Sequence, residues 1–251
     1  MSDMADRVDR ERVFYDTKSD RFDRLRELIW RAIGEFNRNE EITELYDPRG
    51  KRVLLYGCGP ALGSKDFVEA GASEVVGIDI SAGEIEYGQQ VAAQGGYADR
   101  VDLKVADAHH TGLPDRSFDL IMGTAILHHL DVRLALAELR RLLAPNGRAV
   151  FLEPLAHNPI LRVGRRLTPS ARTDDEHPFT VEDWRLCAEA FPGFWHREAE
   201  LTSIPLMPLS FVLPRAWQRG LADRAGAFDD RLLARYPGLG RYARTTTIVL
   251  E

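Results

Sequence analysis

Glycine residues interrupt the apolar segment VLLYGCGPALGS, residues 53–64, at three positions. Gly57, Gly59 and Gly63 leave the main chain bare where a buried strand gives way to a helix, so a ligand can approach the backbone closely there. Asp79 stands 22 residues beyond Gly57, at the end of the next apolar run. A carboxylate at that place can accept hydrogen bonds from both hydroxyls of a ribose. The spacing therefore predicts a site for a nucleoside ligand.

These glycines do not fit the G-x-G-x-x-G fingerprint of dinucleotide-binding folds. When the pattern starts at Gly57, its third glycine would fall on Leu62, so the pattern fails by one place. The mismatch disfavours a nicotinamide-dinucleotide oxidoreductase, which we keep as an alternative interpretation.

Strands and helices alternate between Lys51 and about Pro154, and these elements must position the glycine turn. Strands are predicted over 52–57, 74–80, 101–107, 118–124 and 148–154, and helices over 64–70, 82–93 and 131–143. The first strand is a continuous apolar run, as expected for a strand that is buried on both faces. Alternation with short links predicts an α/β fold with a doubly wound sheet, in which ligands bind at the carboxyl ends of the strands.

The composition excludes several classes of protein. Of 251 residues, 44% are hydrophobic and 29% are charged, and the net charge of −6 without a basic stripe disfavours nucleic acid as a partner. The sequence contains no run of 18 apolar residues, so no membrane span is predicted. Its first residues lack the apolar core of a signal peptide. The two cysteines do not suggest a disulfide framework, which fits a reduced, cytoplasmic protein. The sequence does not indicate an oligomeric state.

Five segments together resemble class I S-adenosylmethionine-dependent methyltransferases of the bacterial small-molecule type. They are VLLYGCGPA, VVGIDIS, VADAHHTGLPDRSFDLI, LHHL and LAPNGRAVFLEP, which follow one another in the order and spacing of that family over about residues 51–155. The resemblance implies a Rossmann-like seven-stranded sheet, S-adenosylmethionine as cofactor and S-adenosylhomocysteine as product. On this basis we divide the chain into an N-terminal helical extension or lid (1–50), the cofactor-binding core (51–155), an acceptor-binding or lid segment interleaved with late strands (156–244) and a final strand of the core sheet (245–251).

The resemblance also implies which residues contact the cofactor. Asp79 would hold the ribose, Ile80 would lie against the adenine, and Asp107 and Ala108 would meet the adenine edge. Tyr15 or Phe14 of the N-terminal extension could close over the cofactor, and a role as a packing aromatic is the alternative. The full expected set is Tyr15, Tyr56, Gly57, Cys58, Gly59, Asp79, Ile80, Asp107, Ala108, His109, Gly123 and Thr124. Two positions depart from the family pattern. Leu55 replaces an acid that commonly helps to hold the methionine ammonium, and Ala61 replaces a glycine, which is tolerable if its φ stays negative.

Four residues are candidates for removing a proton from the acceptor. His129 follows the fourth predicted strand, Glu153 and His157 follow the fifth, and His177 lies in the later insertion. A neutral imidazole suits a general base near pH 7, and the alternative interpretation of His129 is a structural histidine that caps the loop over the cofactor. No metal site is expected, because none of the histidine pairs has the spacing of local metal ligands.

The expected function is methyl transfer to a small molecule, at oxygen or carbon, as in natural-product or other secondary metabolism. The Asn/Asp-Pro-Pro-Tyr signature of nitrogen acceptors is absent, since GTAI stands after the fourth strand. A non-catalytic binding protein with the same fold is a further alternative, which Leu55 slightly favours. In the later segment, Thr180 and Asp183 are spaced as a capping box for the helix that carries Trp184.

Overall fold

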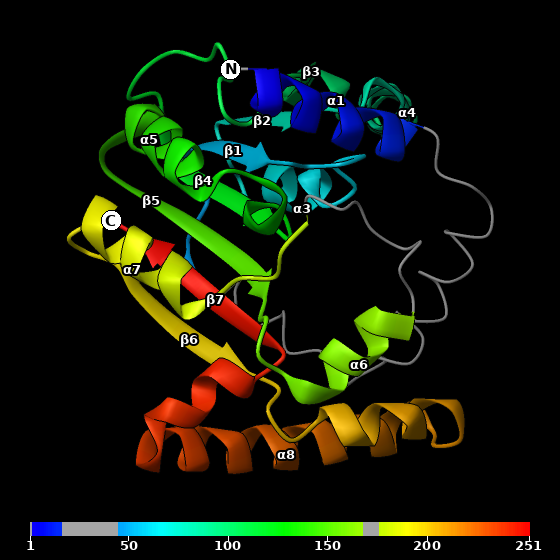
Figure 1. The fold of residues 1–251 in the computed structure, drawn as a ribbon. Helices are drawn as coiled ribbons and strands as arrows, with labels where there is room; N and C mark the ends of the chain where they lie inside the picture. The colour runs from blue at the N-terminus through cyan, green and yellow to red at the C-terminus, as the bar shows by residue number, and fades with distance from the viewer. Residues whose placement is uncertain (1, 17–44, 168–175) are drawn as a thin grey trace.

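The computed structural model describes residues 2–16, 45–167 and 176–251. A seven-stranded sheet in the order β3-β2-β1-β4-β5-β7-β6 forms the centre of the molecule (Figure 1). Its strands are β1 (Arg52–Tyr56), β2 (Glu74–Asp79), β3 (Val101–Val105), β4 (Phe118–Thr124), β5 (Leu143–Pro154), β6 (Trp195–Ala199) and β7 (Thr245–Leu250). Only β7 runs antiparallel to its neighbours, between β5 and β6. The predicted α/β fold with a seven-stranded, doubly wound sheet is confirmed.

Helices follow the strands as the alternation predicts. They are α1 (Ser2–Asp16), α3 (Ser64–Glu69), α4 (Ala82–Gln94), α5 (Val132–Leu142), α6 (Pro159–Leu167), α7 (Val181–Ala190) and α8 (Arg215–Arg235), with short 3₁₀ turns η3 (Ala98–Arg100), η4 (Leu127–His129), η6 (Ile204–Phe211) and η7 (Pro237–Tyr242). The part of the predicted N-terminal helical extension over residues 17–44 lies outside the described residues. Among the helices that the structure describes, none combines the length and the apolar character needed to cross a bilayer.

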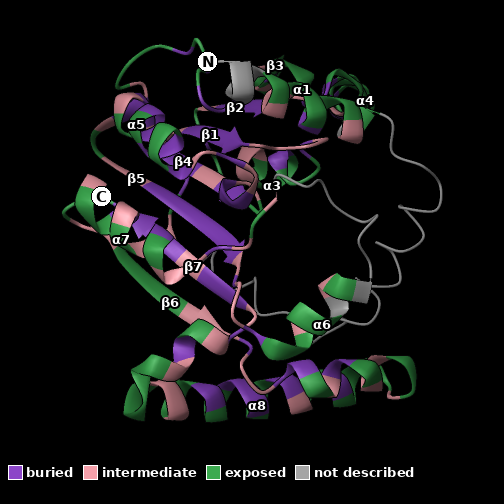
Figure 2. Ribbon diagram, viewed as in Figure 1, coloured by how far each residue is buried: buried purple, intermediate pink, exposed green. Residues whose placement is uncertain are grey.

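Strand β1 is buried on both faces, as its apolar run predicts (Figure 2). Leu54 and Tyr56 point to one face and pack in the larger core cluster with apolar residues of α5 and α7. Val53 and Leu55 point to the other face and pack with apolar residues of α3 and with β2 and β4. Because successive side chains of a strand alternate between faces, only an apolar residue at every position satisfies both layers.

The glycine turn after β1 packs closely against α4. A Cβ atom added at Gly88 of α4 would lie 2.6 Å from the carbonyl oxygen of Pro60 and 2.9 Å from a methyl group of Leu103. Gly88 therefore permits the helix to approach the backbone of the turn. At Gly83 of the same helix, the nearest atom to an added Cβ would be the Ser81 hydroxyl at 3.9 Å.

The later segment adds a strand and an outer helical layer. Strand β6 was not predicted, because its residues WHREA are mostly polar and exposed at the sheet edge. The predicted capping box is confirmed: Thr180 N–H donates to Asp183 Oδ2 at 2.8 Å, and Asp183 N–H donates to Thr180 Oγ1 at 3.3 Å.

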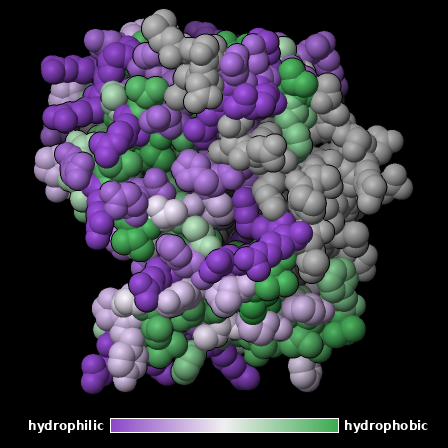
Figure 3. All heavy atoms as spheres, viewed as in Figure 1, coloured by the Kyte–Doolittle hydropathy of each residue, from purple (hydrophilic) through white to green (hydrophobic). Residues whose placement is uncertain are grey.

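Apolar residues gather on the surface of the outer layer, toward the bottom of Figure 3. Val212 and Trp217 of this layer are 74% and 72% exposed.

The close contact at Gly88 makes a prediction about stability. Gly88→Ala should lower the free energy of unfolding by about 1–2 kcal/mol, because overpacking against fixed backbone outweighs the better helix propensity of alanine. Urea denaturation followed by circular dichroism measures the change. Gly83→Ala is the matched control and should leave stability unchanged or raise it by up to about 1 kcal/mol. If the two variants are equally stable, the proposed close contact is wrong.

Candidate functional site

The glycine turn is fastened to the end of β2 by Asp79. Gly57 and Gly59 have φ angles of +66° and +51°, a region in which glycine has no steric penalty. Gly59 N–H donates to Asp79 Oδ2 at 2.7 Å, and Ser81 N–H donates to Asp79 Oδ1 at 3.0 Å. The same carboxylate therefore holds the turn after β1 and the start of α4 in place.

Ala61 corrects one expectation from the sequence. Its φ is +48°, so the assumption of a negative φ is wrong. The positive φ belongs to a tight turn in which Ala61 N–H donates to the Cys58 carbonyl at 2.9 Å. An alanine in this region costs roughly 1–2 kcal/mol. Its methyl group is buried in the core cluster beside Leu55, and that burial offsets part of the cost.

A cavity opens beside the turn at the carboxyl ends of β1 and β2. Six of the expected cofactor residues line it: Gly57, Asp79, Ile80, Asp107, Ala108 and His109. Residues that were not expected complete the wall, namely Arg7, Val8, Glu11, Ile78, Ala106, Ile126 and Leu130. His129, a candidate base, also lines this cavity. The structure thus brings together residues from four strand ends and the N-terminal helix.

Hydrogen bonds fix the orientation of the Asp107 and His109 side chains in the wall of this cavity. His109 Nδ1 lies 2.8 Å from Asp107 Oδ1, while His109 Nε2 lies 2.9 Å from the backbone N–H of Asp131. Because the Asp131 N–H can only donate, Nε2 accepts and Nδ1 carries the proton that it donates to Asp107. Burial by itself raises the pKa of Asp107, but the hydrogen bonds from His109 outweigh it and lower that pKa. Asp107 is therefore an anion with a fixed orientation.

The buried side chain of Tyr56 supports the cavity wall that contains Asp107 and Ala108. Its side chain is fully buried, and its hydroxyl donates to the carbonyl oxygen of Ala108. Burial raises the pKa of Tyr56 well above its ordinary value, so the hydroxyl stays protonated as a donor. Tyr56 thus positions the turn that carries Asp107 and Ala108.

A second cavity shares Gly57 with the first and extends along the other side of the turn. Besides Gly57, four expected residues line it: Tyr56, Cys58, Gly123 and Thr124. Burial and the nearby Asp79 carboxylate raise the pKa of the Cys58 thiol far above its usual range, so it remains neutral. Leu55 also lines this cavity, and the lining drawn from the described part of the chain contains no carboxylate. Gly59 lines neither cavity and acts through its backbone.

Helix α1 covers the first cavity and is attached near its middle and at its C-terminal end. Arg7 Nη2 donates to the His129 carbonyl oxygen at 2.8 Å, and the Ser81 hydroxyl donates to Asp16 Oδ1 at 2.6 Å. Arg7 and Glu11 are four residues apart and so share one helix face. This spacing is the feature of the sequence that could have predicted that both side chains face the same cavity. Tyr15 lies in α1, but its side chain is outside the described part of the structure.

Glu153, a candidate general base, is buried behind η4 and does not reach either cavity. Its side chain is fully buried and accepts hydrogen bonds from the N–H groups of Ile126 and Leu127 at 3.0 and 2.8 Å. Its other carboxylate oxygen lies 2.7 Å from His128 Nδ1. Glu153 therefore holds η4, the turn after β4, and does not line either cavity.

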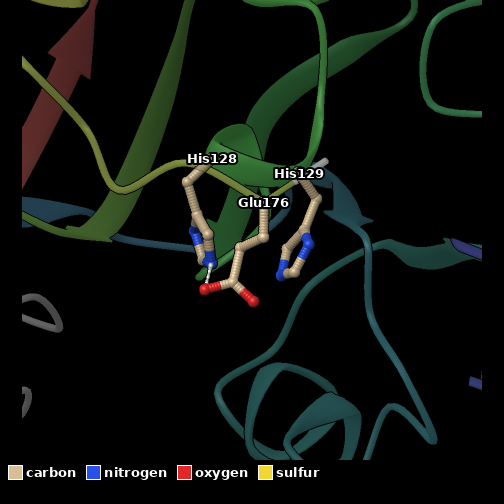
Figure 4. A group of neighbouring side chains, drawn as sticks. All are labelled: His128, His129 and Glu176. Atoms are coloured by element: carbon tan, nitrogen blue, oxygen red, sulfur yellow. Dashed lines mark ion pairs between the residues drawn. The ribbon is translucent and has the colours of Figure 1, made fainter. Parts of the chain in front are cut away.

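The three candidate histidines are not brought together. His129 reaches the first cavity, whereas His157 is half-buried, His177 is exposed, and neither lines the cavities described above. The backbone N–H of His177 donates to the His128 carbonyl at 3.0 Å. This contact places Glu176 beside the two histidines of η4 (Figure 4). Sequence reasoning missed Glu176, because it is remote in sequence from η4 and carries no local motif.

The buried position of Glu153 leads to a stability prediction. Glu153→Gln should cost about 2 kcal/mol or more, because an amide NH₂ group would face buried N–H donors and His128 would lose a charged acceptor. Chemical denaturation measures the loss. Glu86→Gln changes an exposed carboxylate of α4 in the same way and should stay within about 0.5 kcal/mol of the wild type. Equal stability of both variants would contradict the holding role assigned to Glu153.

Comparison with known proteins agrees with this geometry. Residues 54–151 match a family model described as a methyltransferase domain. Aklanonic acid methyltransferase DauC of Streptomyces sp. (strain C5) is 33% identical over 145 residues, which cover 56% of this chain and 63% of that protein. Demethylmenaquinone methyltransferase of Symbiobacterium thermophilum is 27% identical over 147 residues, which cover 57% and 58%. The chain thus spans about six tenths of the length of these two relatives.

The fold is also that of solved methyltransferases. Geranyl diphosphate C-methyltransferase from Streptomyces coelicolor A3(2) superposes with a TM-score of 0.61 at 14% identity, covering 84% of this chain and 77% of that chain. At this identity the similarity concerns the fold. The matched family model and the shared fold agree that residues 54–151 carry a methyltransferase domain.

Proposed function

We propose that this protein transfers a methyl group from S-adenosylmethionine to an oxygen or carbon atom of a small-molecule acceptor. The observation that carries the proposal is the turn at Gly57–Gly59, which is bonded to Asp79 through Gly59 and has a cavity on each side. An elongated nucleoside ligand fits across such a turn. The relatives named for aklanonic acid and for demethylmenaquinone support a small organic acceptor.

In this proposal the cofactor lies across the turn with its nucleoside part in the first cavity. A carboxylate offers about four acceptor positions, so Asp79 can hold the glycine turn and a ribose at once. Ile80 and Ala108 provide apolar contacts for the adenine, and the oriented Asp107 can accept from its amino group. The methionine part would occupy the second cavity, near Gly123 and Thr124.

The cofactor supplies a methyl group that the positive sulfonium charge has already activated. The protein then has to align the acceptor, exclude water and, for a hydroxyl or an acidic carbon, remove a proton. Helix α1 is placed to exclude water, because Arg7 and Asp16 attach it across the first cavity. We assign proton removal to His129 of η4, because this turn directly follows Gly123 and Thr124, near which the methionine part would lie.

The alternative functions find less support. The dinucleotide-binding fold has the strand order 3-2-1-4-5-6, whereas here the antiparallel β7 lies between β5 and β6. This topology, with the missing third glycine, disfavours a nicotinamide-dependent oxidoreductase. A non-catalytic binding protein with this fold is separated from an enzyme by turnover, since a fold alone does not fix a function.

Cofactor binding gives the direct test of this proposal. Asp79→Ala should weaken S-adenosylhomocysteine binding at least tenfold, because it removes charge-assisted hydrogen bonds worth about 1.5–3 kcal/mol each. Isothermal titration calorimetry measures the affinity. Asp99→Ala removes an exposed carboxylate of η3 and should bind as the wild type does. Unchanged affinity in a folded Asp79→Ala protein would refute the assigned ribose site.

Turnover tests the assignment of proton removal. His129→Asn should lower kcat at least tenfold at saturating S-adenosylmethionine, because loss of a group that removes a proton typically costs 10²–10⁴-fold. Release of S-adenosylhomocysteine is measured with a panel of phenolic, quinone and polyketide acceptors. His157→Asn and His177→Asn serve as controls and should stay within a few-fold of the wild type. A full rate for His129→Asn would remove His129 from the mechanism.

A further inference from the structure

Two histidines and a glutamate converge beside the first cavity. His128, His129 and Glu176 each offer one ligand atom, and these atoms all lie within 4.8 Å of one another. Figure 4 shows both imidazole rings directed toward the Glu176 carboxylate. The histidines come from η4 and the glutamate from the segment before α7, so only the folded chain assembles the group.

Each histidine also has a carboxylate on its other side. His128 Nδ1 lies 2.7 Å from Glu153 Oε2, so its Nε2 is presented to Glu176 Oε1 at 4.0 Å. His129 Nδ1 lies 3.3 Å from Glu11 Oε2. Histidines that bind metals commonly have such a carboxylate partner, which fixes the ring orientation and raises the basicity of the coordinating nitrogen. The environment of the His128 ring thus matches that of a metal-binding histidine, whereas His129 Nδ1 and Glu11 Oε2 lie close together without forming a hydrogen bond.

The charges around the cluster favour a cation. Glu11, Glu153 and Glu176 supply three negative charges within this largely buried region. Two guanidinium groups face them: Arg165 Nη1 lies 2.6 Å from Glu176 Oε1, and Arg7 donates to the His129 carbonyl. With neutral imidazoles the five groups sum to one net negative charge. A carboxylate has two oxygens, so Glu176 can bind Arg165 and a cation together.

We propose that His128, His129 and Glu176 bind one divalent cation of the first transition row, of which Zn²⁺, Mn²⁺ and Co²⁺ are representatives. Imidazole ligands favour these ions over Mg²⁺ and Ca²⁺, which prefer oxygen alone. Ligand atoms about 2.1 Å from a tetrahedral metal are roughly 3.4 Å apart. Small side-chain rotations therefore suffice to close the present cluster around an ion.

The position of this site suggests its role, which rests on the proposed methyl transfer. Turn η4 follows Gly123 and Thr124, near which the proposed function places the methionine part, so an acceptor hydroxyl beside the methyl group can take a remaining coordination position. A bound cation lowers the pKa of a coordinated oxygen. The hydroxyl gives its proton to solvent, and the resulting oxygen anion takes the methyl group from the sulfonium, which becomes a neutral thioether. His129 would then act as a metal ligand in place of a general base.

Metal binding to the whole protein, without cofactor, tests the site. Titration with Co²⁺, followed by its visible absorption, and calorimetry with Zn²⁺ should both show one equivalent per chain. Glu176→Gln and His129→Asn should each weaken binding at least tenfold, since even loss of an outer partner of a metal ligand typically costs 10–100-fold. Glu182→Gln and His110→Asn alter exposed residues of the same types and should bind as the wild type does.

The outcomes separate this proposal from the proposed function. If the wild type binds no equivalent, or if the ligand variants bind as tightly as their controls, the metal site is refuted. Loss of binding in His196→Asn would also refute it, because His196 and Glu198 form a separate pair at 2.5 Å. Binding of S-adenosylhomocysteine, measured in parallel, reports on the cofactor site independently. Cofactor binding without metal binding would refute only the metal site. Metal binding without cofactor binding would refute only the proposed methyltransferase function.

Discussion

The carboxylate of Glu153 organises the part of the molecule where acceptor chemistry is expected. It is buried at the end of β5, and its oxygens accept from the backbone of η4 and contact the His128 ring. Hydrogen bonds to an ionised acceptor are stronger than neutral ones, and several of them are needed to compensate for the burial of the charge. The path of η4 therefore depends on this side chain. Because η4 carries His129, the cavity wall depends on it as well.

The same arrangement extends to the N-terminal helix. Arg7 reaches the carbonyl oxygen of His129, so the position of η4 determines where α1 can lie across the cavity. At the C-terminal end of α1, Asp16 accepts from the Ser81 hydroxyl at the start of α4. Two hydrogen bonds from well-separated parts of the core thus fix the helix over the ligand site. A covering element attached this way can exclude water while adding few residues to the cavity wall.

The glycine turn contains an alanine in a backbone conformation that alanine disfavours. Gly57 and Gly59 adopt positive φ without steric cost, but Ala61 adopts it as well, although alanine disfavours it. The buried methyl group of Ala61 lies in the same core cluster as Leu55, the apolar residue at the position where the family resemblance implies an acid. These two departures thus occur in one contact region. The second cavity is consequently more apolar on this side, and a ligand ammonium there would meet no carboxylate from the described residues.

The sequence by itself determined the alternating sheet, the turn at Gly57, its partner Asp79 and the capping box of Thr180. Each of these depends on local periodicity or on the meeting of strand ends at one edge, which follow from spacing along the chain. Only the tertiary structure decided that β6 joins the sheet, that Arg7 and Glu11 line the cavity, and that Glu176 meets the histidines of η4. These features arise from contacts between segments far apart in sequence. No local pattern encodes such contacts, because the distances between those segments are set by the packing of the whole core.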